Sequence, residues 1–356
     1  MLIVENLRKY FPMAQSFTDI LLRRPAKTIK AVDGVSFTLA RGEVLAIVGE
    51  SGCGKTTIAR TLIGLEEQTA GQILFHGQVV GAQERRSMAG LAMLESGAVG
   101  TREQQTLPRM SLKHLRQQAQ MIFQDPYESL NPRATIFEIV AEPLVVHGIA
   151  RGREERLARV KTALEEAGLR PAEDYYLRYP HELSGGQRQR VVIAGAMVLQ
   201  PELLIADEPV SMLDVSIRAE ILNLLRDLQQ KRGVSLVFIT HDLSTVAYFA
   251  DRLAVMYLGR IVETGLTAEV LKNPQHPYTK ALLSVVPVPN PRLRRERVIL
   301  QGETPNPANL PGGCRFHPRC PVAVEKCKST DPAVVDVSET HRAACLLVKP
   351  DRPEGL

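Results

Sequence analysis

The sequence has no tryptophan, few aromatic residues (5%) and no long apolar run. A helix that crosses a membrane needs about 20 predominantly apolar residues, and the longest apolar candidates, at 191–199 and 234–240, are far shorter. The first ten residues mix apolar with charged and polar positions, so they lack the apolar core of a secretion signal. We therefore expect a cytosolic chain that reaches a membrane only through a partner.

Cysteine is also scarce, with five residues among 356, and four of the five follow residue 310. A reducing cytosol excludes a disulfide framework, so their clustering indicates a metal or cluster site. The formal charge of +5 is spread along the chain, which is typical of solvated surface, and we expect no nucleic-acid partner. The length predicts about two domains with a full hydrophobic core.

Three short apolar runs that end in polar residues predict buried parallel strands, at 44–50, 203–207 and 235–240. Longer segments with helical spacing, such as 157–167 and 217–231, alternate with them, which predicts an α/β sheet. The stretch 125–199 is mostly helical in pattern and predicts a helical subdomain inserted into this core. Residues 81–109 lack any sustained period and predict an exposed insertion, to which we assign no function.

The segment GESGCGKT at 49–56 matches the phosphate-binding pattern G-x-x-x-x-G-K-[ST], follows an apolar strand and precedes a helix-like segment. Glycines let backbone N–H groups turn toward phosphates, and the helix N-terminus adds its dipole. Lys55 would neutralise the β and γ oxygens, and Thr56 would supply a hydroxyl to Mg²⁺. The predicted phosphate-binding residues are Gly49, Glu50, Ser51, Gly52, Cys53, Gly54, Lys55, Thr56 and Thr57.

Two acidic residues follow the apolar run LLIA. Asp207 ends a buried strand, where an ionised carboxylate is costly unless it is paired, so a role in holding Mg²⁺ through water explains it better than solvation. Glu208 follows at the strand exit and is the natural general base for an attacking water. An Asp-Glu pair alone is usually a polar strand end, but the phosphate loop in the same chain favours the catalytic interpretation.

The pentapeptide LSGGQ at 183–187 predicts a second anion-binding site. The hydroxyl of Ser184 and the N–H groups of Gly185 and Gly186, at a helix start, make a second anion site. The predicted binding segment ends at Gln187. With LSGGQ, the phosphate loop and the acidic strand end, the chain resembles the ATPase subunits of ABC transporters over nearly its whole length. The resemblance implies a P-loop, RecA-like core with an inserted α-helical subdomain and an antiparallel β N-terminal region.

The resemblance also assigns roles to single residues. Gln124 in MIFQDP is similar to the glutamine that contacts Mg²⁺ and couples to the membrane subunit, and His241 in ITHDL resembles the switch histidine on the γ-phosphate. Asp214 takes the aspartate position of the segment SMLDVS, where Met212 replaces the usual alanine. Phe11 stands where the family places an aromatic to stack on adenine; the alternative is a core aromatic.

In the family, LSGGQ docks on the γ-phosphate that the other subunit binds. The resemblance therefore implies a head-to-tail dimer with a second copy or with a paralogous ATPase, in which ATP hydrolysis drives a domain movement.

The segment HPYTKALL at 276–283, the cysteine module, and the stretches KYFP, RRPAKTIK and AVDGVSF resemble the second of the paired ATPases of oligopeptide and dipeptide importers. This implies an ATPase domain at 1–268, a C-terminal extension at 269–356, two membrane permeases, an extracytoplasmic substrate-binding protein and a peripheral position at the cytoplasmic face of the membrane. Import of nickel or sugars, an exporter, and a soluble ABC ATPase of DNA repair or ribosomes are the alternatives.

Dense proline after residue 286 predicts a linker into the module of Cys314, Cys320, Cys327 and Cys345. The spacing C-x5-C-x6-C-x17-C is longer than the usual pairs of structural zinc sites. Related subunits are understood to carry a four-iron, four-sulfur cluster on these cysteines, which four thiolates suit. Cluster, zinc and metal-free thiols all stay open, with His317 and His341 as substitute ligands.

Overall fold

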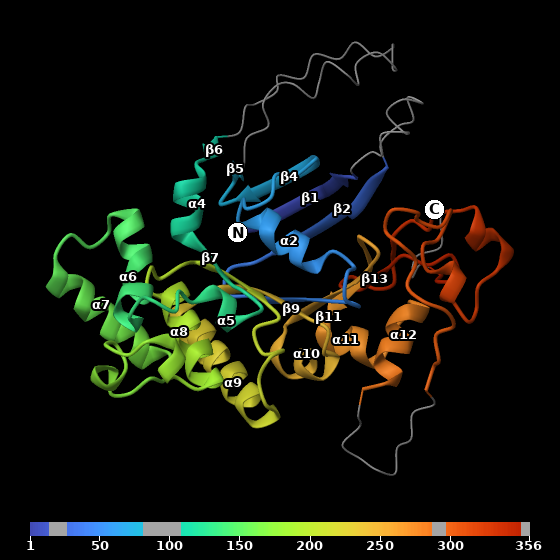
Figure 1. The fold of residues 1–356 in the computed structure, drawn as a ribbon. Helices are drawn as coiled ribbons and strands as arrows, with labels where there is room; N and C mark the ends of the chain where they lie inside the picture. Colours follow the sequence, from blue (N-terminus) through green and yellow to red (C-terminus); the bar gives the residue numbers. More distant parts are fainter. Residues whose placement is uncertain (14–26, 81–107, 287–296, 350–356) are drawn as a thin grey trace.

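The structure is a computed structural model that describes residues 1–13, 27–80, 108–286 and 297–349 (Figure 1). In these residues it contains a five-stranded and an eight-stranded sheet with helices around them. The mixed α/β fold predicted from the sequence is confirmed. The insertion predicted at 81–109 lies outside the described residues except for its last two positions, and so does the proline-dense segment 287–296.

The larger sheet is parallel over five of its eight strands. These strands, in spatial order from the edge of the sheet, are β7 (Ala119–Ile122), β8 (Leu203–Asp207), β9 (Ser235–Thr240), β3 (Val44–Val48) and β10 (Arg252–Tyr257). Every residue of β3, β8 and β9 is buried, as expected for parallel strands covered on both faces. These three strands are the ones that the sequence predicts.

The smaller sheet is mostly antiparallel and comes from the N-terminal part of the chain. Its strands, in spatial order, are β2 (Thr28–Leu39), β1 (Leu2–Pro12), β4 (Ala70–Phe75), β5 (Gln78–Val80) and β6 (Arg109–Met110). Helix α2 (Lys55–Leu62) packs between the two sheets, because its buried Ile58 and Leu62 share one core cluster with residues of β1, β2 and β3 (Figure 1).

Helices fill the chain between β7 and β8. They are α5 (Pro126–Ser129), α6 (Ile136–His147), α7 (Arg153–Glu166) and α8 (Gly185–Met197), with 3₁₀ turns η1 (Ala172–Asp174) and η2 (Pro180–Glu182). Residues 125–199 are described throughout and contain no strand. Buried apolar side chains of α6, α7 and α8, among them Val140, Leu164 and Val191, form a core cluster of their own. These helices therefore pack on each other, and α8 also packs on the sheet through a second cluster that contains its Ile193 and Met197.

The remaining connections are helical as well, through α4 (Leu112–Gln118), α9 (Val215–Arg232), α10 (Leu243–Phe249) and α11 (Thr267–Lys272). Leu225 of α9 and Phe249 of α10 pack in one cluster with Phe238 of β9. The helices predicted at 157–167 and 217–231 are α7 and α9, and both begin earlier than predicted. Within the described ranges, no helix has the length and apolarity needed to span a bilayer.

The described residues from 269 onward are called the C-terminal extension here. Beyond the end of α11 it contains α12 (Pro277–Ser284), η3 (His317–Arg319), η4 (Glu325–Lys328), β12 (Val335–Asp336) and β13 (Arg342–Ala343). Strand β13 pairs antiparallel with β11 (Arg260–Leu266), and β11 pairs with β10. The extension therefore contributes two of the eight strands of the core sheet, at the edge opposite β7 (Figure 1).

Buried contacts attach the extension to this sheet. Phe316 is 1% exposed, and its ring centroid lies 5.2 Å from that of Tyr257 in β10 and 5.4 Å from that of Tyr278 in α12. Glu263 of β11 is buried and accepts a hydrogen bond from the Nε2 of His341 at 2.7 Å. A buried carboxylate is costly unless its hydrogen bonds are satisfied, so this pair fixes the position of the extension.

Candidate active site

The polar residues that follow four core strands gather at one edge of the sheet. Strand β7 leads to Gln124, β8 ends in Asp207 and leads to Glu208, β9 leads to His241, and β3 leads into the P-loop at 49–56. The four strands are parallel neighbours. Their carboxyl ends therefore lie together, which is where open α/β sheets bind ligands.

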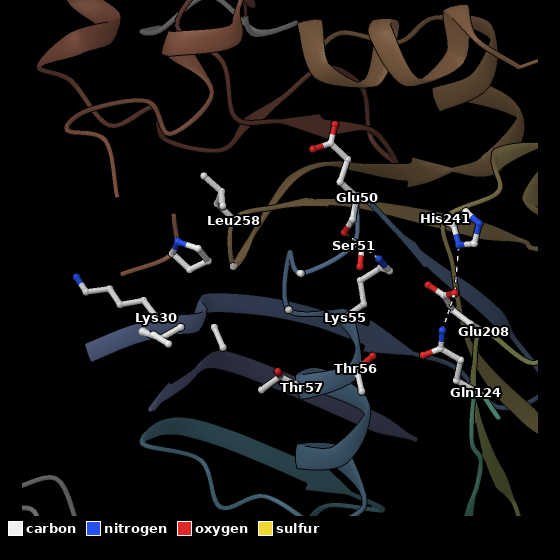
Figure 2. Close-up of a pocket in the computed structure, with 16 residues that line it drawn as sticks. Lys30, Glu50, Ser51, Lys55, Thr56, Thr57, Gln124, Glu208, His241 and Leu258 are labelled. Carbon is white, nitrogen blue, oxygen red and sulfur yellow. Dashed lines mark hydrogen bonds and ion pairs between the residues drawn. The ribbon is translucent and has the colours of Figure 1, made fainter. Parts of the chain in front are cut away.

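A pocket of about 560 Å³ opens at this edge (Figure 2). It is lined by Ile29, Lys30, Ala31, Glu50, Ser51, Gly52, Gly54, Lys55, Thr56, Thr57, Gln124, Glu208, His241, Leu258, Gly259 and Pro307. In Figure 2, Glu208, His241 and Gln124 lie at one end of the pocket, and Lys30 and Leu258 lie at the other. Most of the predicted phosphate-binding residues and all four predicted catalytic residues, Glu208, His241, Gln124 and Lys55, thus share one pocket.

The P-loop backbone is packed too tightly for a side chain at two of its glycines. A Cβ at Gly54, whose φ is +108°, would lie 2.1 Å from the carbonyl oxygen of Ala31, and a Cβ at Gly49 would lie 2.2 Å from that of Met256. Only glycine fits at such approaches. Gly49 and Cys53 are not among the residues that line the pocket, and burial raises the pKa of the Cys53 thiol.

Lys55 places a positive charge inside the loop. Its side chain is 5% exposed, and its Nζ donates to the carbonyl oxygens of Gly49 at 2.8 Å and Glu50 at 3.0 Å. Helix α2 begins at this residue, so the helix dipole points its positive end at the same place. Both features favour a bound phosphate.

Glu208 is held by residues from two neighbouring strand ends. Its Oε2 lies 3.2 Å from the Nδ1 of His241 and accepts a hydrogen bond from the Nε2 of Gln124 at 3.4 Å. Its φ of +47° is in the left-handed region, which is strained for a residue other than glycine and is characteristic of functional sites. Its side chain is 14% exposed, so the carboxylate faces the pocket with limited access to water.

Asp207 is 2% exposed, and its Oδ1 has no hydrogen-bond partner among the described residues. Burial raises its pKa, as does the charge of Glu208, while the hydroxyl of Thr56 and the charges of Lys55 and Arg60 oppose the rise. A buried carboxylate oxygen without a partner is costly, and a cation removes that cost. The hydroxyl, carboxylate and amide oxygens gathered here are ligands of the kind that Mg²⁺ prefers.

The LSGGQ pentapeptide forms the start of α8. Ser184 is the N-cap: its Oγ accepts from the N–H of Gln187 at 3.3 Å, and the Oε1 of Gln187 accepts from the N–H of Ser184 at 2.9 Å. Ser184 is exposed, and Ser184, Gly185, Gly186 and Gln187 are all absent from the lining of the pocket that contains the P-loop. The hydroxyl proton of Ser184 is thus free to donate outward.

Two further predicted residues are placed outside the pocket. Phe11 is not among the lining residues, although its cross-strand partner Ile29 is, and the Nζ of Lys9 lies 4.7 Å from the centroid of the Phe11 ring. Asp214 is the exposed N-cap of α9, and Met212 beside it is 59% exposed. The adenine-stacking role of Phe11 and the dimer role of Asp214 stay predictions.

Two of the four C-terminal cysteines, Cys314 and Cys327, are joined by a backbone hydrogen bond. The N–H of Cys314 donates to the carbonyl oxygen of Cys327 at 2.9 Å. Burial raises the pKa of the Cys314 thiol, and the charges of Cys327, Cys345 and Cys320 raise it further. In the described part of the chain, no three His, Cys, Asp or Glu side chains form a group that could hold a single metal ion.

The two histidines proposed as substitute ligands have other hydrogen bonds. The Nε2 of His341 lies 2.7 Å from Glu263, and the Nδ1 of His317 lies 2.9 Å from the carbonyl oxygen of Cys314.

Sequence reasoning missed the wall of the pocket opposite Glu208. Strand β2 supplies three of its residues, the turn after β10 supplies Leu258 and Gly259, and the extension supplies Pro307. None of these positions carries a local pattern.

Sequence reasoning also missed the partners of Glu50. Burial alone would raise its pKa, but hydrogen bonds from Arg319 and Thr304 and the charge of Arg319 outweigh burial and lower the pKa.

Comparison with known proteins agrees with this geometry. A family model described as ABC transporter matches residues 32–211, and one described as oligopeptide/dipeptide transporter, C-terminal region, matches residues 262–327. The chain is 46% identical over 346 residues to the oligopeptide transport ATP-binding protein AppF of Bacillus subtilis, covering 97% of this chain and 96% of that protein. It is 48% identical over 329 residues to OppF of Escherichia coli, covering 92% and 90%.

A solved structure, the dimeric ATP-binding cassette MJ0796 in a post-hydrolysis state bound to ADP and Pi, is similar with a TM-score of 0.58. It is 26% identical and covers 75% of this chain and 99% of that one. Fold and site together thus define a P-loop ATPase of the ABC type. The chain belongs to the ABC transporter family, as an ATP-binding subunit of the oligopeptide and dipeptide importer group. This confirms the resemblance drawn from LSGGQ and the phosphate loop.

Proposed function

We propose that this chain hydrolyses ATP in a head-to-tail dimer and thereby drives uptake of oligopeptides or dipeptides through partner permeases. One observation carries the proposal. A single pocket unites the P-loop with Glu208, His241 and Gln124, whereas the LSGGQ segment lies outside that pocket at an exposed helix start. Such a chain holds one half of each of two ATP sites.

Within the pocket, Lys55 neutralises the β and γ oxygens of ATP. Thr56 through its hydroxyl, Gln124 by direct contact and Asp207 through water would hold Mg²⁺, which when bound would shield the charge of the same oxygens. The unpartnered Oδ1 of Asp207 supports this assignment. Glu208 accepts the proton of the attacking water, and its bonds to Gln124 and His241 hold the carboxylate in place.

The second half of each site comes from another chain. Ser184 and the N–H groups at the start of α8 bind the γ-phosphate of the ATP held by the partner. Asp214 contributes to the seam between the two subunits. The partner is a paralogous ATPase or a second copy, and the dimeric state of the solved cassette MJ0796 supports the paired arrangement. Hydrolysis therefore requires closure of the dimer.

The remaining partners follow from the family. We propose two transmembrane permeases, contacted near Gln124, an extracytoplasmic substrate-binding protein that acts through the complex, and a peripheral position at the cytoplasmic face of the membrane. Peptide as the solute is supported by the names of the relatives. Nickel and sugars are the alternative solutes of the same machinery.

We also propose the domain limits: an ATPase domain at 1–268 with a helical subdomain at 125–199, and an extension at 269–356. The separate core cluster of α6 to α8 supports the subdomain, and the family match at 262–327 supports the extension. A four-iron, four-sulfur cluster on the four cysteines of 314–345 is a further proposal, because four thiolates suit such a cluster. Iron and acid-labile sulfide assays on anaerobically purified protein test it; absence of both rejects it, and zinc content then separates zinc from free thiols.

The function is tested by purifying a tagged chain from detergent-solubilised membranes and reconstituting the complex in vesicles with labelled peptides. We expect permeases to co-purify and ATP to drive peptide uptake. Co-purification of ribosomes or DNA without permeases would contradict a transport function. Uptake of nickel or a sugar in place of peptides would contradict only the proposed solute.

A further inference from the structure

The second residue of the P-loop is held by the C-terminal extension at three points. Arg319 donates to both carboxylate oxygens of Glu50, at 2.8 Å and 3.2 Å. The hydroxyl of Thr304 donates to the same carboxylate at 2.6 Å, and the N–H of Glu50 donates to the hydroxyl of Tyr278 at 2.9 Å. All three partners lie 228 or more residues away in the sequence.

The bond between Arg319 and Glu50 is shielded from water. The Arg319 side chain is 10% exposed and that of Glu50 is 26% exposed. Two parallel bonds between a guanidinium and a carboxylate fix both the distance and the orientation of the groups. An ion pair with this geometry and this shielding contributes more than an exposed surface pair.

Glu50 transmits this restraint to the phosphate site through its backbone. Its carbonyl oxygen accepts a hydrogen bond from the Nζ of Lys55 at 3.0 Å. Figure 2 shows the Glu50 carboxylate directed away from Lys55 and Thr56 while its main chain forms the loop. The extension therefore contacts the side of the P-loop that faces away from the phosphate site, while the other side of the loop lines the pocket.

A second arginine of the same segment supports the opposite wall. Arg315 donates to the carboxylate of Asp33, which also accepts from the hydroxyl of Tyr10, and to the carbonyl oxygen of Leu258. Leu258 lines the pocket, as does Pro307 of the extension itself. Two arginines four positions apart thus reach two walls of one pocket.

We propose that Arg319 is a positioning residue for ATP: by fixing Glu50 it holds the P-loop in the conformation that binds phosphates, which makes the extension a part of the ATP site. The inference rests on the proposed function. The guanidinium of Arg319 bonds Glu50 and Thr304 and also interacts with the hydroxyl of Tyr257. Glu208 bonds Gln124 and His241 at the other end of the pocket. The effect therefore falls on ATP affinity and KM, and kcat changes little.

The test measures the Kd of the full-length chain for Mg-ATP by calorimetry, and KM and kcat in the assembled complex. We expect Arg319→Ala to weaken ATP binding about tenfold, which corresponds to about 1.4 kcal/mol. Arg319→Lys should restore affinity in part, because an ammonium keeps the charge but not the two parallel bonds. Arg342→Ala is the matched control, since Arg342 is an arginine of the extension whose pair with Asp336 is exposed.

Glu50→Gln weakens the same ion pair by removing the charge of its P-loop partner. It allows the inference to be tested even if circular dichroism shows that Arg319→Ala does not fold. If Arg319 acts through Glu50, the double variant loses no more affinity than either single variant. Additive losses would mean a general structural role and overturn the inference, as would an Arg319→Ala chain that binds ATP as tightly as Arg342→Ala. Failure of the wild-type chain to bind ATP overturns the proposed function and this inference together.

Discussion

His276, the first residue of the HPY segment, should make the protein lose stability in acid. It is 1% exposed, caps α12 by accepting the N–H of Tyr278 on its Nδ1 at 3.1 Å, and donates its own N–H to Glu263. Burial lowers its pKa to about 4, and Lys280 lowers it while Glu263 opposes. The unfolded chain, with a pKa near 6.5, therefore binds the proton more tightly than the folded chain.

The direction of the pH dependence of stability follows from this difference in pKa. The contribution of His276 is complete above about pH 6.5, declines as the pH falls, and is gone below about pH 4. Each pH unit in this window removes about 1.4 kcal/mol, so the step from about pH 7 to about pH 5 removes about 2 kcal/mol. His276→Asn keeps a capping acceptor but cannot titrate in this range.

The assay is urea unfolding at the two pH values, followed by far-UV circular dichroism because the chain has no tryptophan. We expect the wild type to lose about 2 kcal/mol more than His276→Asn between about pH 7 and about pH 5. His181→Asn, at an exposed histidine stacked on Tyr179, is the matched control and should behave as the wild type. Equal losses in wild type and His276→Asn would refute the reasoning.

Three further changes test the site and the packing. Glu208→Gln should lower kcat by about 10²–10⁴-fold while an ATP-bound dimer accumulates, as seen by phosphate release and size-exclusion chromatography, and a wild-type rate would contradict the assignment of the base. Lys55→Ala should weaken ATP binding itself in calorimetry, and an unchanged Kd would contradict its role at the phosphates. Phe316→Ala should cost about 4 kcal/mol in urea unfolding, because its buried ring packs on Tyr257 and Tyr278. Val322→Ala, at a half-exposed position of the extension, should stay within about 0.5 kcal/mol of the wild type, and equal losses in the two variants would contradict the packing argument.

Local patterns predicted the strands that carry the chemistry. Buried parallel strands are continuous apolar runs, and functional side chains follow their carboxyl ends, so Asp207 and Glu208 were placed from the sequence alone. Helix starts were less well predicted. Helix α7 begins at Arg153, four residues before the apolar spacing starts, because its first turn is built from charged residues that favour helices without any apolar period.

Long-range contacts of the extension were beyond sequence reasoning. Strands β12 and β13 have two residues each, too few to show an alternating pattern. Arg315 and Arg319 lie in GCRFHPRC, a segment whose cysteines indicate a metal or cluster site. Their partners Asp33 and Glu50 lie 282 and 269 residues away, and no feature of a single sequence connects such positions.

The distance between Glu50 and Arg319 also has a consequence for biosynthesis. A ribosome adds about 5–20 residues per second, so the 269 residues that separate them take roughly 13 to 54 seconds to make. During synthesis Glu50 of the P-loop precedes Tyr278 by 228 residues, Thr304 by 254 and Arg319 by 269, so the loop lacks each partner until that residue has been made. Full nucleotide affinity should consequently arise only after the segment that contains Arg319 has been made and has folded back onto the P-loop.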